Sequence, residues 1–443
     1  MTMENLRNCV SLLCIIMISL IVVLMLHATP CICYTSYVFG DSLVDAGNND
    51  YIFTLSKADS PPYGIDFAPS GGKPTGRFTN GRTISDIIGE ALGNESFPPP
   101  YLSPDSLSNA VLGGLNYASG ASGILDQTGT LFIGRISLGA QISYFEQTRT
   151  YMVRAMGENG TRTFLSKALF SLTIGSNDVL NYFQPSIPFF EEIKVSPTVF
   201  QDFMISNLTV QLKRARKFVV VGVGPLGCIP FVRALRLVAS GKCSVEVNTL
   251  IQGYNRKLSA LLQHLNQELG PEAMFVYANS YDVVTGIIQN YRHYGFDNGE
   301  DPCCGGYFPP YVCFKGSNAN MSSTLCDNRS KYVFWDAYHP TEAANIIISE
   351  KLLNEAAEEE FRSRSRSRSR RMGHVVRVRF ASFFAGAALT SAIGLYVLRD
   401  DYKSAHQSIS LQMDGLYETL DGRISKLEKL KEVEAAKQGE ATE

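Results

Sequence analysis

The chain has 443 residues, of which 45% are hydrophobic and 19% are charged. This composition excludes a disordered chain and provides enough apolar material for a large core. The formal net charge of −2 hides an asymmetry, because residues 362–443 carry 15 basic and 10 acidic side chains whereas residues 34–361 carry 24 and 31. A body with this excess of acidic groups argues against a nucleic-acid partner.

The first 33 residues have the layout of a secretory signal peptide. Residues 10–26 are seventeen consecutive uncharged residues, and Arg7 precedes them. Cys31 and Cys33 lie at positions −3 and −1 of a cleavage site before Tyr34. An uncleaved signal anchor is the alternative, because the apolar run is long. We expect cleavage, and therefore a secreted or extracellular protein.

Secretion changes the interpretation of the cysteines. Six remain after the predicted cleavage: Cys228, Cys243, Cys303, Cys304, Cys313 and Cys326. An even number in an oxidising compartment predicts disulfide bonds, and six cysteines allow fifteen connectivities. Zinc is the competing interpretation, but the chain has no CxxC pair and only six histidines, so no metal is expected. Five sequons are candidate N-glycosylation sites: Asn94, Asn159, Asn207, Asn320 and Asn328.

The C-terminal part resembles a second protein joined to the first. Residues 356–371 predict an Arg-Ser-rich linker, because the run RSRSRSRSRR is too densely charged to pack. Such repeats also occur in RNA-associated segments, which would conflict with a signal peptide. Within residues 372–443, the nineteen uncharged residues 380–398 predict a transmembrane helix and possible membrane attachment. An amphipathic or coiled-coil helix is predicted after it.

Residues 34–355 alternate short apolar runs with helical patterns. The predicted strands are 37–39, 168–174, 217–223 and 273–277, and helix candidates include 83–92, 197–214 and 245–269. This alternation predicts a parallel sheet with helices on both faces. Ligands bind beyond the carboxyl ends of the strands in such sheets, and polar GDS and GSND segments follow the first two predicted strands. We therefore expect the active site there.

Ser42, in FGDSLVDAGNN, is the candidate nucleophile, because it directly follows a predicted buried strand and is flanked by Gly40. A helix cap is the alternative role for an Asp-Ser pair. A serine hydroxyl needs a base within hydrogen-bond reach, itself oriented by a third group. His339 and Asp336 lie three residues apart in DAYHP and can supply both. Taken alone, a single histidine is more often structural.

Ester hydrolysis also needs preorganised donors for a tetrahedral oxyanion. Three candidates follow from the sequence: the Ser42 N–H, the Gly120 N–H in NYASGASGI and the Asn177 amide in GSND. Glycine has no Cβ, so a ligand can approach the Gly120 N–H closely. Each of these segments could instead be an ordinary turn.

Together and in order, several blocks resemble those of the GDSL (SGNH-hydrolase) esterase/lipases, specifically the large secreted plant subfamily. The blocks are FGDSLVDAGNN, GRFTNGRTISDII, NYASGASGI, IGSNDVLNYF, VVGVGPLGCIP and FWDAYHPTEAAN. The resemblance runs from about Tyr34 to Leu353. It implies a flavodoxin-like three-layer α/β/α fold and hydrolysis of a small-molecule ester or lipid by a Ser-His-Asp set, without metal or cofactor.

Carried over by motif, the resemblance implies that Ser42 is the nucleophile, His339 the base and Asp336 its partner. It also implies that the Ser42 N–H, the Gly120 N–H and the Asn177 amide form the oxyanion hole. Two other functions stay open. An acyltransferase would use the same residues, and a catalytically silent, membrane-attached interaction protein would use the C-terminal part.

One segment departs from the family pattern. The family usually has an LYxLGARKF-like stretch before the third long strand, whereas residues 211–218 are QLKRARKF. Several residues are missing from this helix-to-strand connection. We expect the shortened connection to strain the packing beneath the site, with more effect on solubility than on chemistry.

Overall fold

The computed structural model describes residues 35–94, 96–104, 106, 110–184, 195–213, 215–236, 238–270, 273–305, 313 and 324–369. The predicted signal peptide, the apolar segment 380–398, the helix predicted after it and the sequon at Asn320 lie outside these residues and stay predictions. Among the helices in the described ranges, none combines the length and apolar character that a bilayer span requires.

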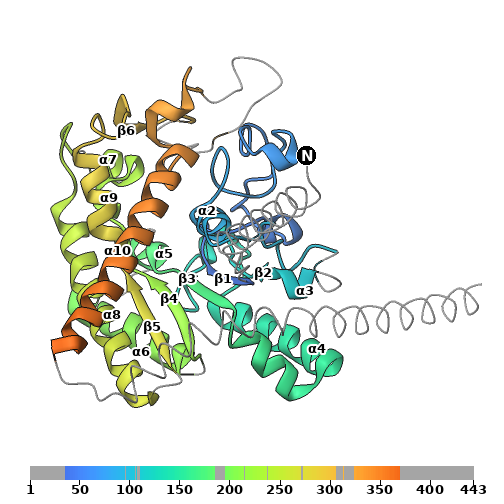
Figure 1. The fold of residues 1–443 in the computed structure, drawn as a ribbon. Coiled ribbons are helices and arrows are strands. Elements are labelled where there is room, and N and C mark those ends of the chain that lie inside the picture. The colour runs from blue at the N-terminus through green and yellow to red at the C-terminus, as the bar shows by residue number, and fades with distance from the viewer. Residues whose placement is uncertain are drawn as a thin grey trace, which may run out of the picture. The chain divides into compact units, whose positions relative to one another are not determined.

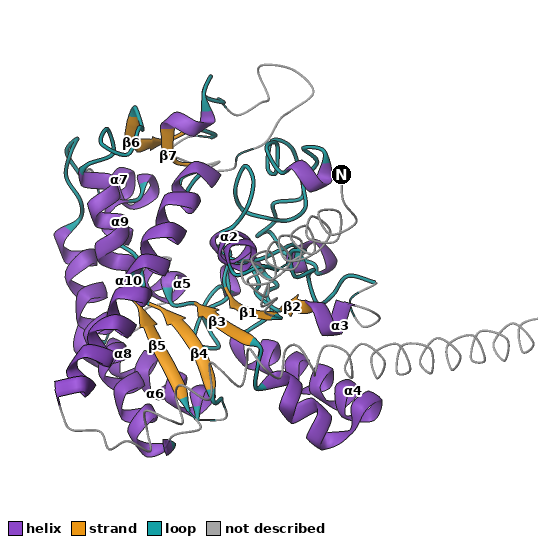
Figure 2. Cartoon of the chain, viewed as in Figure 1, coloured by secondary structure: helices purple, strands orange, loops and turns teal. Residues whose placement is uncertain are grey.

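Five parallel strands form the central sheet, in the order β2-β1-β3-β4-β5 (Figures 1 and 2). Their bounds are β1 Ser36–Gly40, β2 Gly114–Asn116, β3 Leu169–Thr173, β4 Lys217–Val221 and β5 Met274–Ala278. The four strands predicted from apolar runs are confirmed. Sequence analysis missed β2, because its three residues, Gly-Leu-Asn, do not form an apolar run. A second, two-stranded sheet pairs β6 (Asn298–Pro302) with β7 (Tyr332–Phe334).

The helices are α2 Ile84–Ala91, α3 Ala110–Gly113, α4 Leu138–Leu165, α5 Ser176–Phe183, α6 Pro197–Leu212, α7 Pro230–Leu235, α8 Val245–Glu268, α9 Ser280–Gln289 and α10 Glu342–Ser369. The three helix candidates correspond to α2, α6 and α8. Local signals explain where two of them begin. Thr83 and Asp86 form a capping box at the start of α2, and Ser196 caps α6 with a proline in its first turn.

Helices cover both faces of the sheet. Successive side chains of a strand point to opposite faces, so Val38 and Phe39 of β1 mark the two sides. Val38 shares a pocket with residues of α2 and α10, whereas Phe39 faces residues of α4 and α6. Aromatic rings fill the second side, where Phe39 stacks on Tyr117 with ring centroids 4.9 Å apart. The predicted three-layer α/β/α architecture is confirmed.

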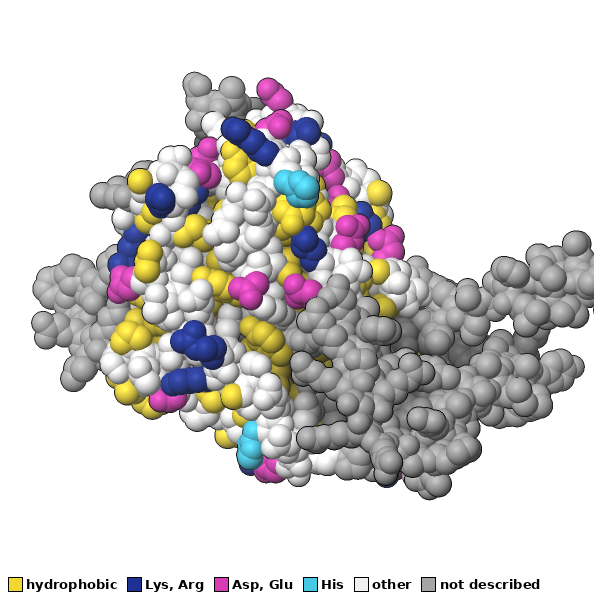
Figure 3. All heavy atoms as spheres, turned by 60° about the vertical axis from the view of Figure 1, so that its left-hand side comes forward, with side chains coloured by type: hydrophobic (Ala, Val, Ile, Leu, Met, Phe, Trp, Pro, Cys, Tyr) yellow, Lys and Arg dark blue, Asp and Glu magenta, His cyan; other side chains and the backbone are white. Residues whose placement is uncertain are grey.

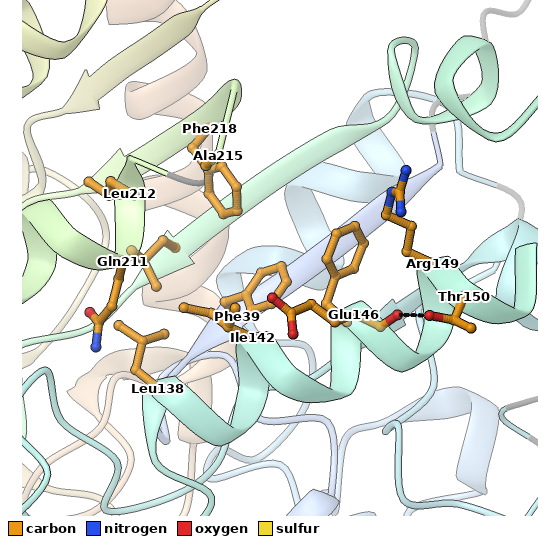
Figure 4. A pocket seen from close by; sticks show the side chains of 12 residues that line it. Phe39, Leu138, Ile142, Glu146, Arg149, Thr150, Gln211, Leu212, Ala215 and Phe218 are labelled. Carbon is orange, nitrogen blue, oxygen red and sulfur yellow. Dashed lines mark hydrogen bonds between the residues drawn. The ribbon is translucent and has the colours of Figure 1, made fainter. Parts of the chain in front are cut away.

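A cavity lies next to the connection between α6 and β4. Helix α6 ends at Leu212 and β4 begins at Lys217. Beneath this connection lies a cavity of about 440 Å³ (Figure 4). Its walls come from α4, α6 and the aromatic face of the sheet: Phe39, Leu138, Ile142, Phe145, Glu146, Arg149, Thr150, Leu172, Gln211, Leu212, Ala215 and Phe218. The side-chain oxygen of Gln211 is buried there without a hydrogen-bond partner.

Helix α10 differs from the predicted linker at residues 356–371. The helix extends to Ser369 and therefore includes most of the Arg-Ser run. On the face drawn in Figure 3, basic and acidic side chains are interspersed.

The disulfide prediction is confirmed, and the structure selects one connectivity. The pairs are Cys228–Cys243, Cys303–Cys326 and Cys304–Cys313. The last two lie in a small apolar cluster with Trp335, which immediately follows β7. Backbone hydrogen bonds from Cys303 to Phe334 and from Cys304 to Trp335 tie this disulfide-bonded region to the loop that carries Asp336 and His339.

Candidate active site

Ser42 lies in the tight turn that follows β1. Gly40 ends the strand with φ 151°, and a Cβ at this position would lie 2.2 Å from the carbonyl oxygen of Thr173. The turn is closed by Asp41, whose carboxylate accepts the Leu43 N–H at 3.1 Å and whose carbonyl accepts the Asp45 N–H at 3.1 Å. The Ser42 hydroxyl is therefore presented at the carboxyl end of a central strand, as predicted.

His339 and Asp336 meet Ser42 across 297 and 294 positions of the chain. The His339 Nε2 lies 2.8 Å from the Ser42 Oγ, and its Nδ1 lies 2.9 Å from both Asp336 oxygens. The loop also binds itself, because Asp336 Oδ1 accepts the backbone N–H groups of Tyr338 at 2.8 Å and His339 at 2.7 Å. The Ser42 hydroxyl, the His339 imidazole and the Asp336 carboxylate therefore form one continuous hydrogen-bonded chain.

The surroundings keep Asp336 ionised. Asp336 is 2% exposed, and burial opposes ionisation. The His339 ring and the hydrogen bonds from the Tyr338 and His339 N–H groups outweigh burial, so the pKa of Asp336 lies below its usual value. The Phe78 ring lies against His339, with centroids 5.3 Å apart, and limits the positions that the imidazole can take.

The Gly120 N–H, expected as an oxyanion donor, has an internal partner in this structure. It donates to Asp45 Oδ2 at 2.9 Å. A Cβ at Gly120 would lie 2.6 Å from Phe78 and 2.7 Å from Asn49, so glycine is required here for internal packing. The next residue, Ala121, lines the active-site cavity with a positive φ of 66°. Among the hydrogen bonds within the described ranges, none has the N–H of Ser42 or Ala121 as donor.

Asn177 lies where sequence analysis placed it, at the start of α5 beside the nucleophile. Its side-chain amide donates to the Ser122 carbonyl at 2.9 Å, which fixes the orientation of the amide. A carboxamide has two N–H bonds, so one is held by Ser122 and the other can serve a ligand. Asn177 lines the same cavity as Ser42 and His339.

The cavity above these groups has a volume of about 370 Å³ and a largely apolar wall. The side chains that line it are Ser42, Leu43, Leu55, Ser56, Lys57, Tyr63, Phe78, Ala121, Gly129, Phe132, Ser176, Asn177, Leu180, Asn181, Gln184, Leu226, Ile229, Phe231, Asp336, Tyr338 and His339. Within the part of the chain that the structure describes, no group of three or more metal-ligating side chains is assembled.

Comparison with known proteins assigns the family. A model of the GDSL-like lipase/acylhydrolase family matches residues 37–352, which is most of the chain. The chain belongs to this family. As a GDSL family member it is a carboxylic ester hydrolase.

Several curated relatives come from Arabidopsis thaliana. GDSL esterase/lipase At5g41890 is 62% identical over 329 residues, covering 72% of this chain and 89% of the relative. GDSL esterase/lipases At3g50400 and At4g16230 are 47% and 48% identical over 331 residues, covering 72% of this chain and 86% of each relative. The part of this GDSL hydrolase after the family match therefore has no counterpart in the family model.

Sequence analysis of this GDSL hydrolase missed three contributions to the site. Ala121 has no distinctive sequence signal, because it lies next to Gly120 in the glycine-rich segment NYASGASGI. Tyr63 and Phe78 come from the segment between β1 and α2, where no strand or helix pattern indicates proximity to His339. The block GRFTNGRTISDII contains Phe78 and was the available signal, although its role in the site was not assigned.

Proposed function

We propose that this GDSL hydrolase is a secreted serine esterase that forms an acyl-enzyme on Ser42. The observation that carries the proposal is the hydrogen-bonded chain from Ser42 through His339 to Asp336, with distances of 2.8 and 2.9 Å. Such a chain activates an otherwise weak hydroxyl nucleophile.

His339 acts first as a base. Its Nε2 accepts the Ser42 proton while Oγ attacks the ester carbonyl carbon, and the resulting imidazolium is stabilised by the Asp336 carboxylate. The tetrahedral intermediate collapses when the imidazolium returns the proton to the leaving alcohol. Water then attacks the acyl-enzyme with His339 again as base, and release of the carboxylic acid restores Ser42.

We assign three N–H groups to the stabilisation of the oxyanion. Our assignment is the backbone N–H of Ser42, the backbone N–H of Ala121 and the second side-chain N–H of Asn177. All three residues line the cavity that holds His339, and Ser122 orients the Asn177 amide in advance. Donors fixed before the reaction stabilise developing charge without reorganisation.

The cavity favours an ester with an apolar acyl group, such as a lipid-like ester. Leucine, isoleucine and phenylalanine side chains of three separate segments line it, represented by Leu55, Phe132 and Ile229. Burial of apolar surface would contribute most of the binding energy for such a substrate.

Secretion is supported by the three disulfides, which persist in oxidising compartments.

Glycosylation would require sequons that are exposed at the surface. Asn159, Asn207 and Asn328 are exposed, whereas Asn94 is partly buried and its amide donates to the Ser36 hydroxyl at 2.9 Å. We therefore propose the three exposed asparagines as the acceptor sites among the described sequons.

The test of the proposed function is the Ser42→Ala variant. It should lose hydrolysis of an aryl ester by several orders of magnitude in kcat, and it should no longer be labelled by a fluorophosphonate probe. An unchanged thermal unfolding temperature would show that the fold is intact. A folded Ser42→Ala protein that keeps most of its activity would refute the assignment.

A further inference from the structure

A buried tyrosine hydroxyl donates to the carboxylate of the proposed catalytic chain. The Tyr63 Oη lies 2.8 Å from Asp336 Oδ2, although the two residues are 273 positions apart. Tyr63 is 6% exposed and Asp336 is 2% exposed, so water cannot readily replace this donor. Nothing in the reaction described above uses this hydroxyl.

The Tyr63 ring is fixed by its neighbours. It packs edge-to-face against Trp335, with centroids 6.1 Å apart, and against Phe78, with centroids 6.3 Å apart. Phe78 in turn lies against the His339 ring at 5.3 Å. A ring held in this way loses little freedom when its hydroxyl forms a hydrogen bond, so the donor is preorganised.

The two oxygens of Asp336 have different partners apart from His339. Oδ1 accepts two backbone N–H groups, those of Tyr338 and His339. Oδ2 accepts the Tyr63 hydroxyl, and the His339 Nδ1 lies 2.9 Å from each oxygen. Without Tyr63, the buried Oδ2 would keep the imidazole as its only hydrogen-bond partner among the described residues.

We propose that Tyr63 is a positioning residue for this reaction, which holds the Asp336 carboxylate in place and limits how strongly it stabilises protonated His339. The inference rests on the proposed function of Ser42, His339 and Asp336. Tyr63 acts through Asp336 and not on the substrate.

The other titratable groups facing this pair are few. Asp41, after β1, interacts electrostatically with His339, and Asp178 of α5 acts on Asp41. Tyr338 lies on the same loop as Asp336 and interacts with Tyr63. Burial, followed by the charge of Asp336, raises the pKa of Tyr63 well above its usual value. Tyr63 therefore keeps its proton and remains a donor over the working pH range.

The experiment compares Tyr63→Phe with the wild-type protein in kcat, KM and the pH dependence of kcat/KM. Loss of one donor leaves the carboxylate free to stabilise the imidazolium more strongly. The acidic limb of the kcat/KM profile should therefore shift to higher pH by about 0.5–1 pH unit. The value of kcat should fall about 3–10-fold as the imidazole loses alignment, with KM unchanged within about twofold.

Tyr117→Phe is the matched control. Tyr117 is fully buried, and its hydroxyl donates to Thr148 Oγ1 at the same distance of 2.8 Å, but it lies in the aromatic core away from Asp336. Its loss should lower the unfolding temperature without moving the pH profile. A double-mutant cycle adds a second readout, because Tyr63→Phe should change kcat less than about twofold in an Asp336→Ala background.

Two results would overturn the inference. One is a folded Tyr63→Phe protein with a wild-type acidic limb and kcat, and the other is a rise in KM alone, which would make Tyr63 a substrate contact. If Tyr63→Phe does not fold, 3-fluorotyrosine at this position keeps the ring and makes the hydroxyl a stronger donor. The acidic limb of the kcat/KM profile should then move to lower pH. An acidic limb at the wild-type pH would refute the proposal. Activity retained by Ser42→Ala would instead refute the underlying function.

Discussion

The side chains of the proposed catalytic chain are held by hydrogen bonds within their own loops as well as by one another. Asp336 accepts two N–H groups from the next three residues, and the turn that carries Ser42 is closed by the carboxylate and carbonyl of Asp41. Local bonds of this kind restrict a side chain within its own loop. The long-range contacts, from His339 to Ser42 and from Tyr63 to Asp336, join these loops to one another.

At Asn177, we predict that substitution by alanine lowers kcat about 10²–10³-fold, because one oxyanion donor is lost. KM should change little, since the oxyanion exists only in the transition state and intermediates. Steady-state kinetics with an aryl ester checks this. Asn181→Ala is the control, because Asn181 lines the same cavity from the next turn of α5. A KM effect alone at Asn177 would assign its amide to ground-state binding.

Asp41 provides a pH prediction. Burial raises the pKa of this fully buried carboxyl to about 7, against the lowering effects of the Leu43 N–H and His339. Between about pH 4 and pH 7 the folded protein holds a proton that the unfolded chain releases, so this group lowers stability as pH rises through that window. Asp41→Asn removes this titration. Between pH 5 and pH 8, its free energy of unfolding should therefore fall by about 1–3 kcal/mol less than that of the wild type.

Urea unfolding of Asp41→Asn and wild type at both pH values measures that difference. Burial also raises the pKa of Asp45 to about 7. Because Asp45 is present in both proteins, its contribution to the pH dependence of stability cancels in the comparison. Parallel stability–pH curves for the two proteins would show that Asp41 is ionised throughout.

At the scale of elements, the cavity beside the α6–β4 connection leaves part of the aromatic face of the sheet uncovered. Residues of the sheet, α4, α6 and the connection enclose this cavity, which has a volume of about 440 Å³. Dispersion contacts are lost wherever a wall has no opposing atoms. We therefore expect this cavity to reduce stability on this face, which is opposite to the face that carries α2 and α10.

Filling this cavity should stabilise the protein. Ala215 lines it from the connection itself (Figure 4), so Ala215→Leu should raise the free energy of unfolding by about 0.5–2 kcal/mol. Leu212→Ala enlarges the same cavity and should lower that free energy by about 2–5 kcal/mol. Chemical denaturation of both variants tests the pair. A loss of stability in Ala215→Leu would mean that the connection cannot move to accept the larger side chain.

At the scale of the whole molecule, residues Cys31–Phe361 form one compact unit. The family model ends at residue 352, and every proposed catalytic group lies before it. We predict that residues 34–355 have the same kcat and KM on a soluble aryl ester as residues 34–443. Expression of both forms and comparison of their specific activity checks this. An inactive but folded short form would show that the C-terminal part contributes to the site.

Much of the fold was predictable because its signals are local. The strand at 217–221 is a run of β-branched and aromatic residues, and the Thr83–Asp86 capping box marks the start of α2. The strand at 114–116 escaped prediction, since its position beside β1 depends on hydrogen bonds from another strand and not on its own residues. Its three residues are too few to show an apolar run or an alternation that would predict a strand.

The sequence by itself indicated the family, four of the five strands of the central sheet and the candidates Ser42, Asp336 and His339, because short contiguous segments carry these signals. Only the tertiary structure decided which cysteines pair, that Asp45 occupies the Gly120 N–H, and that Tyr63 reaches Asp336. These facts depend on contacts between segments separated by tens to hundreds of residues. Hydrophobic periodicity and motif spacing predict the secondary structure of a segment. The hydrogen-bond partner of a buried polar atom depends instead on which segments pack against it.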